Sequence, residues 1–292
     1  MTFADLDRRL AHALPGEFLK DFYPRVMRRL AKHGLFRGEG VVRTKHGFDL
    51  HVNRIDSIKW FLKYYREFEP LISAAWKNFL PEGGVVVDIG ANIGYHSLLA
   101  GVCVGPTGKV IAFEPSTTIF RELSANIELN HATQIAAQNL AVSNRSGPVN
   151  LYYAGEDEQG HSSITRGVGP GEVAQAITFA EIGTLVDLAS IDLIKIDVEG
   201  AESLVIEGLL PVAHQLKEQC AIFLEIGFEN DGPTLIGPLL EAGFKARQID
   251  NEYRTGFYRN PGPVALHPVE LRPGELYDVV LCRDEAAFER MT

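Results

Sequence analysis

The chain has 292 residues, of which 46% are hydrophobic and 23% charged, and its formal net charge is −10 at pH 7. These proportions are those of an average globular protein, and they exclude a disordered chain, a collagen-like fibre and a small disulfide-bonded scaffold. The three cysteines, Cys103, Cys220 and Cys282, are scattered, which indicates a reducing, cytoplasmic location and excludes a zinc cluster. No apolar run approaches the roughly 20 residues of a membrane-spanning helix, and the acidic, polar first residues do not resemble a signal peptide.

The charge is distributed unevenly along the chain. Residues 1–45 hold ten Lys and Arg against five Asp and Glu, whereas the remainder has a net charge of −15. The net negative charge of residues 46–292 disfavours a nucleic-acid partner, because phosphate backbones bind to basic surfaces. The basic residues 1–45 could still contact a membrane surface or another anionic partner. Within them, residues 17–33 predict an amphipathic helix, and a docked helix with a solvated basic face is the favoured interpretation.

The next segments complete an N-terminal extension, residues 1–80, that precedes a catalytic domain over residues 81–292. Alternating residues from Val41 to Val52 predict a hairpin around Lys45-His46-Gly47. A helical stretch then covers about Ser57 to Phe79 and is rich in aromatic residues. We expect most of these rings in the core and some at the mouth of a pocket. The extension is expected to recognise the substrate or to cover it as a lid.

From residue 85 onward, short apolar strands alternate with helices, a pattern that predicts an α/β fold with a doubly wound, mostly parallel sheet. We expect edge strands at Val149–Tyr153 and Ala174–Phe179. The main strands are expected at Val85–Asp88, Lys109–Phe113, Gln134–Ala141, Leu193–Asp197, Ala221–Ile226, Lys245–Ile249 and Asp278–Cys282, and helices at about 93–103, 116–130, 199–209 and 232–242.

The first strand and the loop after it indicate a site for an adenosine cofactor. The strand ends at Asp88, and Gly90 and Gly94 frame the turn into a helix, where glycine allows the backbone to approach a ligand closely. The second strand ends at Glu114, whose carboxylate can accept two hydrogen bonds from a ribose diol. Alternatively, Asp88 only caps the next helix and the two glycines only make the turn.

The charge of Asp88 selects among adenosine cofactors. A dinucleotide site would have three glycines and a helix N-terminus facing pyrophosphate, whereas here an acid stands where that anion would lie. S-adenosylmethionine has no phosphate and carries an ammonium and a sulfonium, so a carboxylate complements it. This argument disfavours an NAD-linked oxidoreductase.

A second strand ending in acids reads Lys195-Ile-Asp197-Val-Glu199-Gly-Ala-Glu202. Together with Asp88-Ile-Gly-Ala-Asn-Ile-Gly, Phe113-Glu114-Pro115 and Asn139-Leu-Ala141-Val-Ser143, it resembles the FkbM family of S-adenosylmethionine-dependent methyltransferases. The resemblance runs from about residue 80 to 230 and is weak beyond. It implies the class I methyltransferase fold, a Rossmann-like seven-stranded sheet with its last strand antiparallel. It also implies methyl transfer, usually to a hydroxyl oxygen of a sugar, glycan or polyketide-like small molecule.

The resemblance also implies cofactor contacts. The methionine part would lie against Asp88, Gly90, Asn92 and Gly94. Glu114 would bind the ribose with Ser116 nearby, and the segment Asn139–Ser143 would flank the adenine. The strand order separately predicts that Asp197, on the strand beside the first, faces the reactive end of the cofactor. His161-Ser162-Ser163 matches a histidine–serine stretch of the family, expected in an acceptor-side loop.

An alcohol acceptor loses its proton as the new bond forms, so a positioned base would accelerate transfer by about 10²–10⁴. The candidate catalytic residues are His161, Asp197, Glu199 and Glu225, and Lys195 is expected to orient an acid. The three acids could instead gather Mg²⁺, which would lower the pKa of the acceptor hydroxyl. These acids are not joined in a dense ligand motif such as D-x-D, which favours the metal-free route.

Two further functions remain open. A cofactor-binding module without catalysis would keep Asp88 and Glu114 but would need no base. An N-methyltransferase is a second alternative, although Asn139-Leu-Ala141 lacks the Asn/Asp-Pro-Pro-Tyr/Phe type of motif that many such enzymes use to bind a planar amine. The oligomeric state has no signature in the sequence.

Overall fold

The fold is built around a central sheet that the sequence pattern predicts well. The computed structural model describes residues 40–52, 57–153, 162–163, 171–228, 230–253, 255–272 and 275–292. The strands of the central sheet are β3 (Val85–Ile89), β4 (Lys109–Phe113), β5 (Ile135–Gln138), β10 (Leu193–Ile196), β11 (Ala221–Ile226), β12 (Lys245–Ile249), β13 (Leu266–His267) and β14 (Tyr277–Cys282).

Their order across the sheet is β13-β12-β14-β11-β10-β3-β4-β5. Strands β5, β4, β3, β10 and β11 pair in parallel, and β14 pairs antiparallel with both β11 and β12. The doubly wound sheet with an antiparallel last strand is therefore confirmed, and the two-residue β13 adds an eighth strand to the seven expected. Because β10 lies beside β3, the two motifs that end in acids are neighbours at one edge of the sheet.

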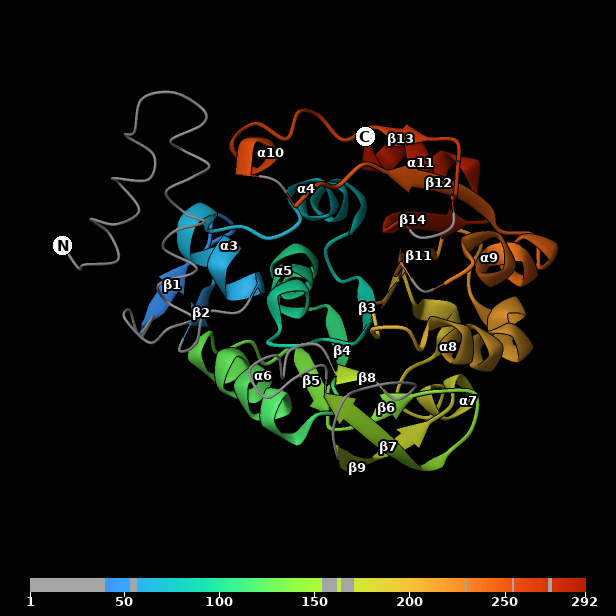
Figure 1. The fold of residues 1–292 in the computed structure, drawn as a ribbon, viewed down its shortest axis with the longest axis horizontal. Coiled ribbons are helices and arrows are strands. Elements are labelled where there is room, and N and C mark those ends of the chain that lie inside the picture. The colour runs from blue at the N-terminus through green and yellow to red at the C-terminus, as the bar shows by residue number, and fades with distance from the viewer. Residues whose placement is uncertain are drawn as a thin grey trace.

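Helices cover both faces of this sheet, as Figure 1 shows. Strand residues such as Val86 and Val87 are fully buried on opposite faces, and each face belongs to a separate apolar core. The helices are α3 (Ser57–Tyr65), α4 (Pro70–Phe79), α5 (Tyr95–Val104), α6 (Thr117–Leu129), α7 (Phe179–Ile182), α8 (Glu202–Leu209), α9 (Gly232–Glu241), α10 (Thr255–Arg259) and α11 (Glu285–Met291), with 3₁₀ turns at Leu188–Ser190 and Leu210–Gln215. No helix within the described ranges is long and apolar enough to cross a bilayer.

The strands expected at the edge of the main sheet form a second sheet instead. Strand β7 (Gly147–Tyr153) pairs antiparallel with β9 (Glu172–Ile177), and β6 (Ala141–Val142) and β8 (Ser162–Ser163) complete it in the order β6-β9-β7-β8. The expected strand Gln134–Ala141 is correspondingly divided, because β5 ends at Gln138 and β6 joins the second sheet. Sequence alternation predicts strands, but it does not say which sheet they join.

The part of the extension within the described residues packs on the catalytic domain. The expected hairpin is confirmed as β1 (Val41–Arg43) and β2 (Asp49–His51), which pair antiparallel. The side chains of Asn126 on α6 and of Asn130 at its C-cap hydrogen-bond to the backbone of β2, so the hairpin is attached to that helix. The expected helix over residues 17–33 lies outside the described residues.

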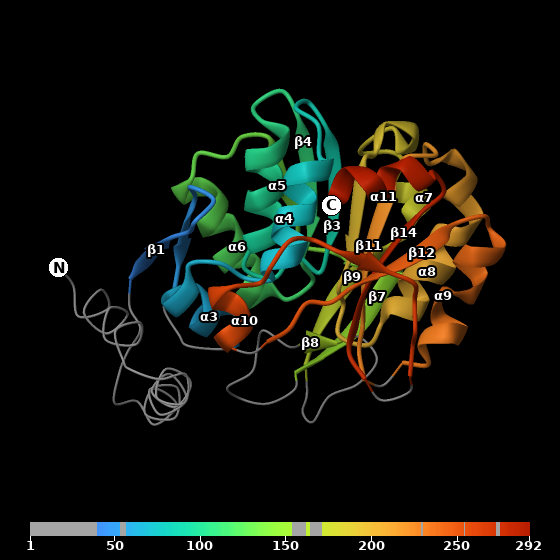
Figure 2. The same cartoon turned by 90° about the horizontal axis from the view of Figure 1, so that it is seen from above.

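The single helix expected over Ser57–Phe79 is two helices, α3 and α4. The chain leaves the helical conformation between them, where Arg66 has φ 58° and Glu69 has φ 43°. Aromatic packing explains the arrangement, because the Phe61 ring on α3 stacks on Tyr258 of α10 with centroids 4.2 Å apart. Figure 2 shows α10 beside α3, so a segment near the C-terminus covers the extension.

Candidate active site

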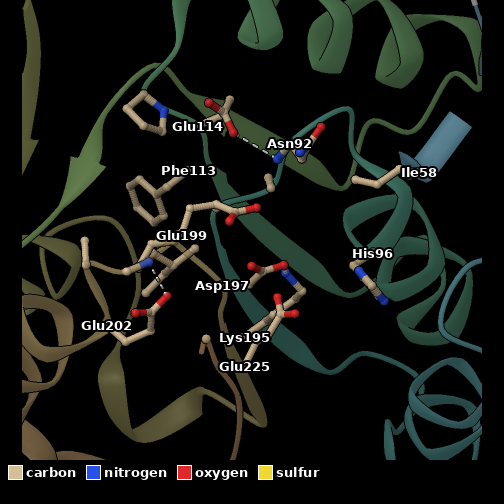
Figure 3. Close-up of a pocket in the computed structure, with 18 of the residues that line it drawn as sticks. Ile58, Asn92, His96, Phe113, Glu114, Lys195, Asp197, Glu199, Glu202 and Glu225 are labelled. Carbon is tan, nitrogen blue, oxygen red and sulfur yellow. Dashed lines mark hydrogen bonds and ion pairs between the residues drawn. The ribbon is translucent and has the colours of Figure 1, made fainter. Parts of the chain in front are cut away.

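A cavity of about 480 Å³ opens where β3, β4, β10 and β11 end. This volume is typical of a site for a small organic ligand, and the carboxyl ends of parallel strands are where open α/β sheets bind their ligands. Its wall includes six carboxyl groups and a single lysine, Lys195. Figure 3 shows Asp197, Lys195 and Glu225 gathered together, away from Glu114 and Asn92.

Glu114 lies in the wall of the cavity at the end of β4. The backbone N–H groups of Asn92 and Ser116 each donate to one of its carboxylate oxygens, at 3.0 and 2.9 Å. Burial raises the pKa of Glu114 to about 7, although these two bonds act in the opposite direction. The two backbone hydrogen bonds hold the Glu114 carboxylate in one orientation, and each of its oxygens can still accept a hydrogen bond from a ligand hydroxyl.

The glycine turn after β3 is shaped by the neighbouring strands. The N–H groups of Gly90 and Ala91 both donate to the carbonyl oxygen of Phe113, which ties this loop to β4. Gly90 has φ 81° and lines the cavity, as does Asn92. Gly94 has φ 89° and precedes α5 as its N-cap, but it is not part of the cavity wall. The alternative that Asp88 caps this helix is therefore wrong.

Asp88 is placed behind the cavity rather than in its wall. Its side chain has no exposed surface, and its Oδ2 accepts a hydrogen bond from the Ser97 hydroxyl at 2.6 Å, whereas Oδ1 has no hydrogen-bond partner. Burial raises the pKa of Asp88, and the nearby Lys195 ammonium lowers it. Asp88 can thus act on a bound cation through its field, but it does not touch the cavity in this conformation.

The residues expected near the adenine divide into two groups. Ala141 lines the cavity together with Leu140. The Asn139 amide instead donates to the carbonyl oxygens of Glu114 and Pro115, at 2.9 and 3.0 Å, so it connects the ends of β5 and β4. Ser116 is fully buried, and its hydroxyl caps α6 by accepting from Ile119. Asn139 and Ser116 therefore position Glu114 and its loop.

At the end of β10, the Asp197 carboxylate takes part both in a buried ion pair with Lys195 and in a hydrogen bond with Glu225. The Lys195 ammonium lies 2.7 Å from Asp197 Oδ2, which confirms that the lysine orients this acid. Glu225 on β11 hydrogen-bonds to the same carboxylate. Lys195 and these hydrogen bonds lower the pKa of Asp197 against the cost of burial, whereas burial and the Asp197 charge raise the pKa of Glu225 well above its ordinary value. Glu225 is therefore the protonated partner and donates to Asp197.

Glu69, His96 and Tyr253 also line the cavity, although none of them was among the predicted site residues, and the last two flank the Glu69 carboxylate. Its Oε1 accepts a hydrogen bond from the Tyr253 hydroxyl at 2.5 Å, and its Oε2 lies 3.3 Å from His96 Nε2. Burial raises the pKa of Glu69 to about 7. Glu69 comes from the extension and Tyr253 from the C-terminal region, so no contiguous motif contains them. The aromatic-rich pattern around Glu69 is the one signal in the sequence that pointed to this segment.

Backbone strain is concentrated in this wall. Five described residues other than glycine have a positive φ, and three of them, Glu69, Asn92 and Glu199, line the cavity. Such conformations cost about 1–3 kcal/mol each and persist where the surrounding structure over-determines them, often at functional sites. The strain therefore marks these three positions as parts of one built site.

Glu199 lines the cavity after β10, and Glu202 beside it accepts hydrogen bonds from the Gly200 N–H and the Asn230 amide. Figure 3 shows both acids on the same side of the view as Phe113. His161 lies outside the described residues. No group of three or more His, Cys, Asp or Glu in the described part of the chain has the geometry of a metal site.

The remaining wall is aromatic and apolar. Phe61 and Phe68 from the extension contribute to it, which confirms that part of the aromatic-rich segment borders a pocket, while Trp60 and Trp76 are buried in the core. Phe228 after β11 also belongs to the wall, and 63% of its surface is exposed. A ligand that fills the cavity would therefore contact acids on one side and rings on the other.

The model of the methyltransferase FkbM domain matches residues 88–246, more than half of the chain. This chain belongs to the FkbM methyltransferase family. The cavity lies within that match at Glu114 and Asp197, and it extends beyond it at Glu69 and Tyr253. The enzyme is accordingly an S-adenosylmethionine-dependent methyltransferase.

Two relatives of this FkbM methyltransferase are similar in sequence. Methyltransferase sdnD of Sordaria araneosa is 28% identical over 202 residues, which are 59% of this chain and 75% of that protein. The AMB antimetabolite synthetase AmbE of Pseudomonas aeruginosa is 30% identical over 192 residues, which are 53% of this chain. The matched region spans 9% of AmbE, so this chain corresponds to a small part of that protein.

Several solved methyltransferases are similar in structure. Fibrillarin of Aeropyrum pernix, with bound S-adenosylmethionine, has a TM-score of 0.43 at 14% identity over 84% of this chain and 82% of that one. An S-adenosylmethionine-dependent O-methyltransferase of Thermotoga maritima has a TM-score of 0.41 at 14% identity, over 84% and 77%. These TM-scores are low, so the fold is assigned from the strand order of the central sheet and not from these similarities.

Proposed function

We propose that this FkbM methyltransferase transfers the methyl group to a hydroxyl oxygen of an uncharged small molecule, of the sugar, glycan or polyketide-like class. The observation that carries the proposal is the pair of buried carboxyl groups at the end of β10, Asp197 and Glu225, which hydrogen-bond to each other beside Lys195 and an aromatic wall. An alcohol must lose a proton as its oxygen forms the new bond, so it needs such a group. A neutral amine can attack first and lose its proton afterwards.

The wall of the cavity fits the cofactor in charge and in hydrogen-bonding capacity. S-adenosylmethionine supplies an electrophilic methyl group on a sulfonium when it is bound. Glu114, held by two backbone N–H groups, would accept hydrogen bonds from the ribose diol. Asp88 and the acids of the wall would favour the positive groups of the cofactor through their field. Gly90, Asn92 and Ala141 line the cavity and would contact the bound cofactor.

The same electrostatics limit the acceptor. Six carboxyl groups and one lysine in the wall oppose an acceptor that carries phosphate, such as a nucleic acid or a nucleotide-linked sugar. The rings of Phe61, Phe68 and Phe228 would bury an apolar face of the acceptor. Because two of these rings come from residues 1–80, the proposed role of this extension in acceptor recognition is supported.

Methyl transfer in this arrangement depends mainly on alignment. Holding two reactants in line can supply about 7–11 kcal/mol of the barrier. The aromatic wall would orient the acceptor, and a carboxylate near Asp197 would take the proton, which adds about 10²–10⁴ in rate. The proposed route needs no metal, so a chelator should leave the rate unchanged.

The test is an assay with S-adenosylmethionine labelled in its methyl group and a panel of methyl glycosides, phenols and aliphatic alcohols, with primary amines as the comparison. We expect a labelled methyl ether and no effect of EDTA. Labelled amines without labelled ethers would replace the proposal by N-methylation. Calorimetry in parallel should detect binding of S-adenosylmethionine and its demethylated product but not of NADH.

A further inference from the structure

We propose that Glu69 is the catalytic base that accepts the proton of the acceptor hydroxyl. The inference rests on the proposed O-methylation and deepens it. It assigns a catalytic role to a residue outside the matched family domain, in the extension at the start of α4. Its position and surroundings favour Glu69 over three other acids of the wall, Asp197, Glu225 and Glu114.

Glu69 is placed as a built-in part of the cavity rather than as a surface acid. Its residue is 3% exposed, it lines the cavity, and it adopts a left-handed backbone with φ 43° and ψ 69°. This position is the N-cap of α4, yet the side chain makes no capping bond. The side chain is instead turned to Tyr253 and His96, so the strained backbone serves the cavity rather than the helix.

The other acids are already engaged. Asp197 is paired with Lys195 and accepts from Glu225, and Glu225 holds its own proton. Glu114 is fixed by two backbone N–H groups at the ribose end. Burial raises the pKa of Glu69 to about 7, a value suited to a base that works near neutral pH.

Glu69 also stands next to groups that can tune it. A second, small cavity of about 10 Å³ is bordered by Glu69, Lys195, Asp197, Glu225 and Asp278. The ammonium of Lys195 lowers the pKa of Glu69, whereas the charges of Asp197 and Asp88 raise it. The titratable and charged groups that face Glu69 are Asp88, Tyr95, His96, Lys195, Asp197, Glu225, Tyr253, Tyr258 and Asp278.

In the proposed step, one bond forms to the methyl carbon as another breaks, and the hydroxyl proton passes to Glu69. The acceptor oxygen forms a bond to the methyl carbon as the carbon–sulfur bond breaks, and the electron pair of that bond stays on sulfur. The hydroxyl proton passes to the Glu69 carboxylate, which becomes neutral. The products are the methyl ether, S-adenosylhomocysteine and protonated Glu69, which releases its proton to solvent after the products leave.

The test compares Glu69→Gln with Glu67→Gln, a matched control. Glu67 is also buried and lies in the same turn, but it pairs with Lys45 and His46 and is not in the cavity wall. With the best acceptor of the hydroxyl panel and saturating cofactor, Glu69→Gln should lower kcat by about 10²–10⁴. Its affinity for S-adenosylhomocysteine should stay within about threefold of wild type, since the proposed ribose contact is made by Glu114 and not by Glu69. Glu67→Gln should retain its turnover per folded molecule.

A second readout needs no acceptor. Infrared difference spectra across the neutral pH range should contain the carbonyl band of a buried carboxylic acid that titrates near pH 7. Because Glu114 titrates in the same range, both variants are made in a Glu114→Gln background, where the band should be absent with Glu69→Gln and present with Glu67→Gln. An unchanged spectrum, or full turnover in Glu69→Gln, would overturn the assignment while leaving O-methylation intact. If wild type labels amines only, the proposed function fails, and the infrared arm still decides whether Glu69 titrates.

Discussion

Gly90 and Asp197 stand at the ends of neighbouring parallel strands, and a Cβ atom added to Gly90 would lie 1.7 Å from the carbonyl oxygen of Asp197. The φ of Gly90 is 81°, which other residues rarely adopt. The two halves of the site are therefore in contact through the backbone, and the turn after β3 admits glycine alone.

Gly90→Ala is expected to destabilise the fold by more than about 3 kcal/mol, since the clash involves backbone that cannot rotate away. Gly237→Ala in α9 is the matched control, because its added Cβ would meet nothing within 4 Å. That change should alter the free energy of unfolding by less than about 1 kcal/mol. Urea unfolding measures both, and equal values for the two variants would contradict the close approach.

Glu114→Ala should weaken binding of S-adenosylmethionine by about 1–3 kcal/mol, because a charge-assisted pair of hydrogen bonds to the ribose is lost. Glu128→Ala, at an exposed position on α6, should leave the dissociation constant unchanged. Isothermal calorimetry gives both values. An unaltered affinity in Glu114→Ala would place the ribose elsewhere in the cavity.

The raised pKa of Glu114 also predicts how stability depends on pH. Its folded pKa of about 7 lies above the ordinary value of 4.5, so between these values the folded state keeps a proton that the unfolded state has released. The contribution of this group is fully present below about pH 4.5 and is lost as pH rises through about 7, by about 1–3 kcal/mol in total.

Glu114→Gln removes that titration. Relative to wild type, the variant should become more stable as pH rises from about 5 to about 8, whatever its offset at low pH. Urea unfolding of both proteins without cofactor at these two pH values measures the difference. Parallel pH dependences in the two proteins would show that Glu114 is ionised throughout.

Lys195→Met should destabilise the protein by about 3–5 kcal/mol, because it leaves Asp197 as a buried charge without its partner. Lys45→Met is a fitting comparison, since the Lys45 side chain in its pair with Glu67 is 49% exposed. Its loss should cost about 1 kcal/mol or less. If Lys195→Met and Lys45→Met lower the free energy of unfolding by equal amounts, the Lys195–Asp197 pair is as well solvated as an exposed ion pair.

Much of the catalytic domain could be predicted from the sequence because its information is local. Apolar runs of about five residues, each followed by a turn and a helix, predicted the parallel strands. Glu114 and Asp197 come directly after two of these runs, so their positions at the ends of β4 and β10 could be predicted from where the runs stop. The position of Glu114 in the cavity wall is a direct consequence, since the carboxyl ends of parallel strands meet at one edge of the sheet.

The tertiary structure decided what the acids do. Asp88 has the residue type expected of a ligand contact, yet the packing of α5 buries it behind the wall. Glu69 and Tyr253 are far apart in sequence and meet only because the aromatic segments of α3 and α10 pack together. The pKa of Glu69 follows from desolvation, from the Lys195 ammonium and from the charge of Asp197, all of which depend on distance and burial. Periodicity in a sequence determines which face a residue occupies, whereas the electrostatics of a site depend on neighbours that the chain brings together only when it folds.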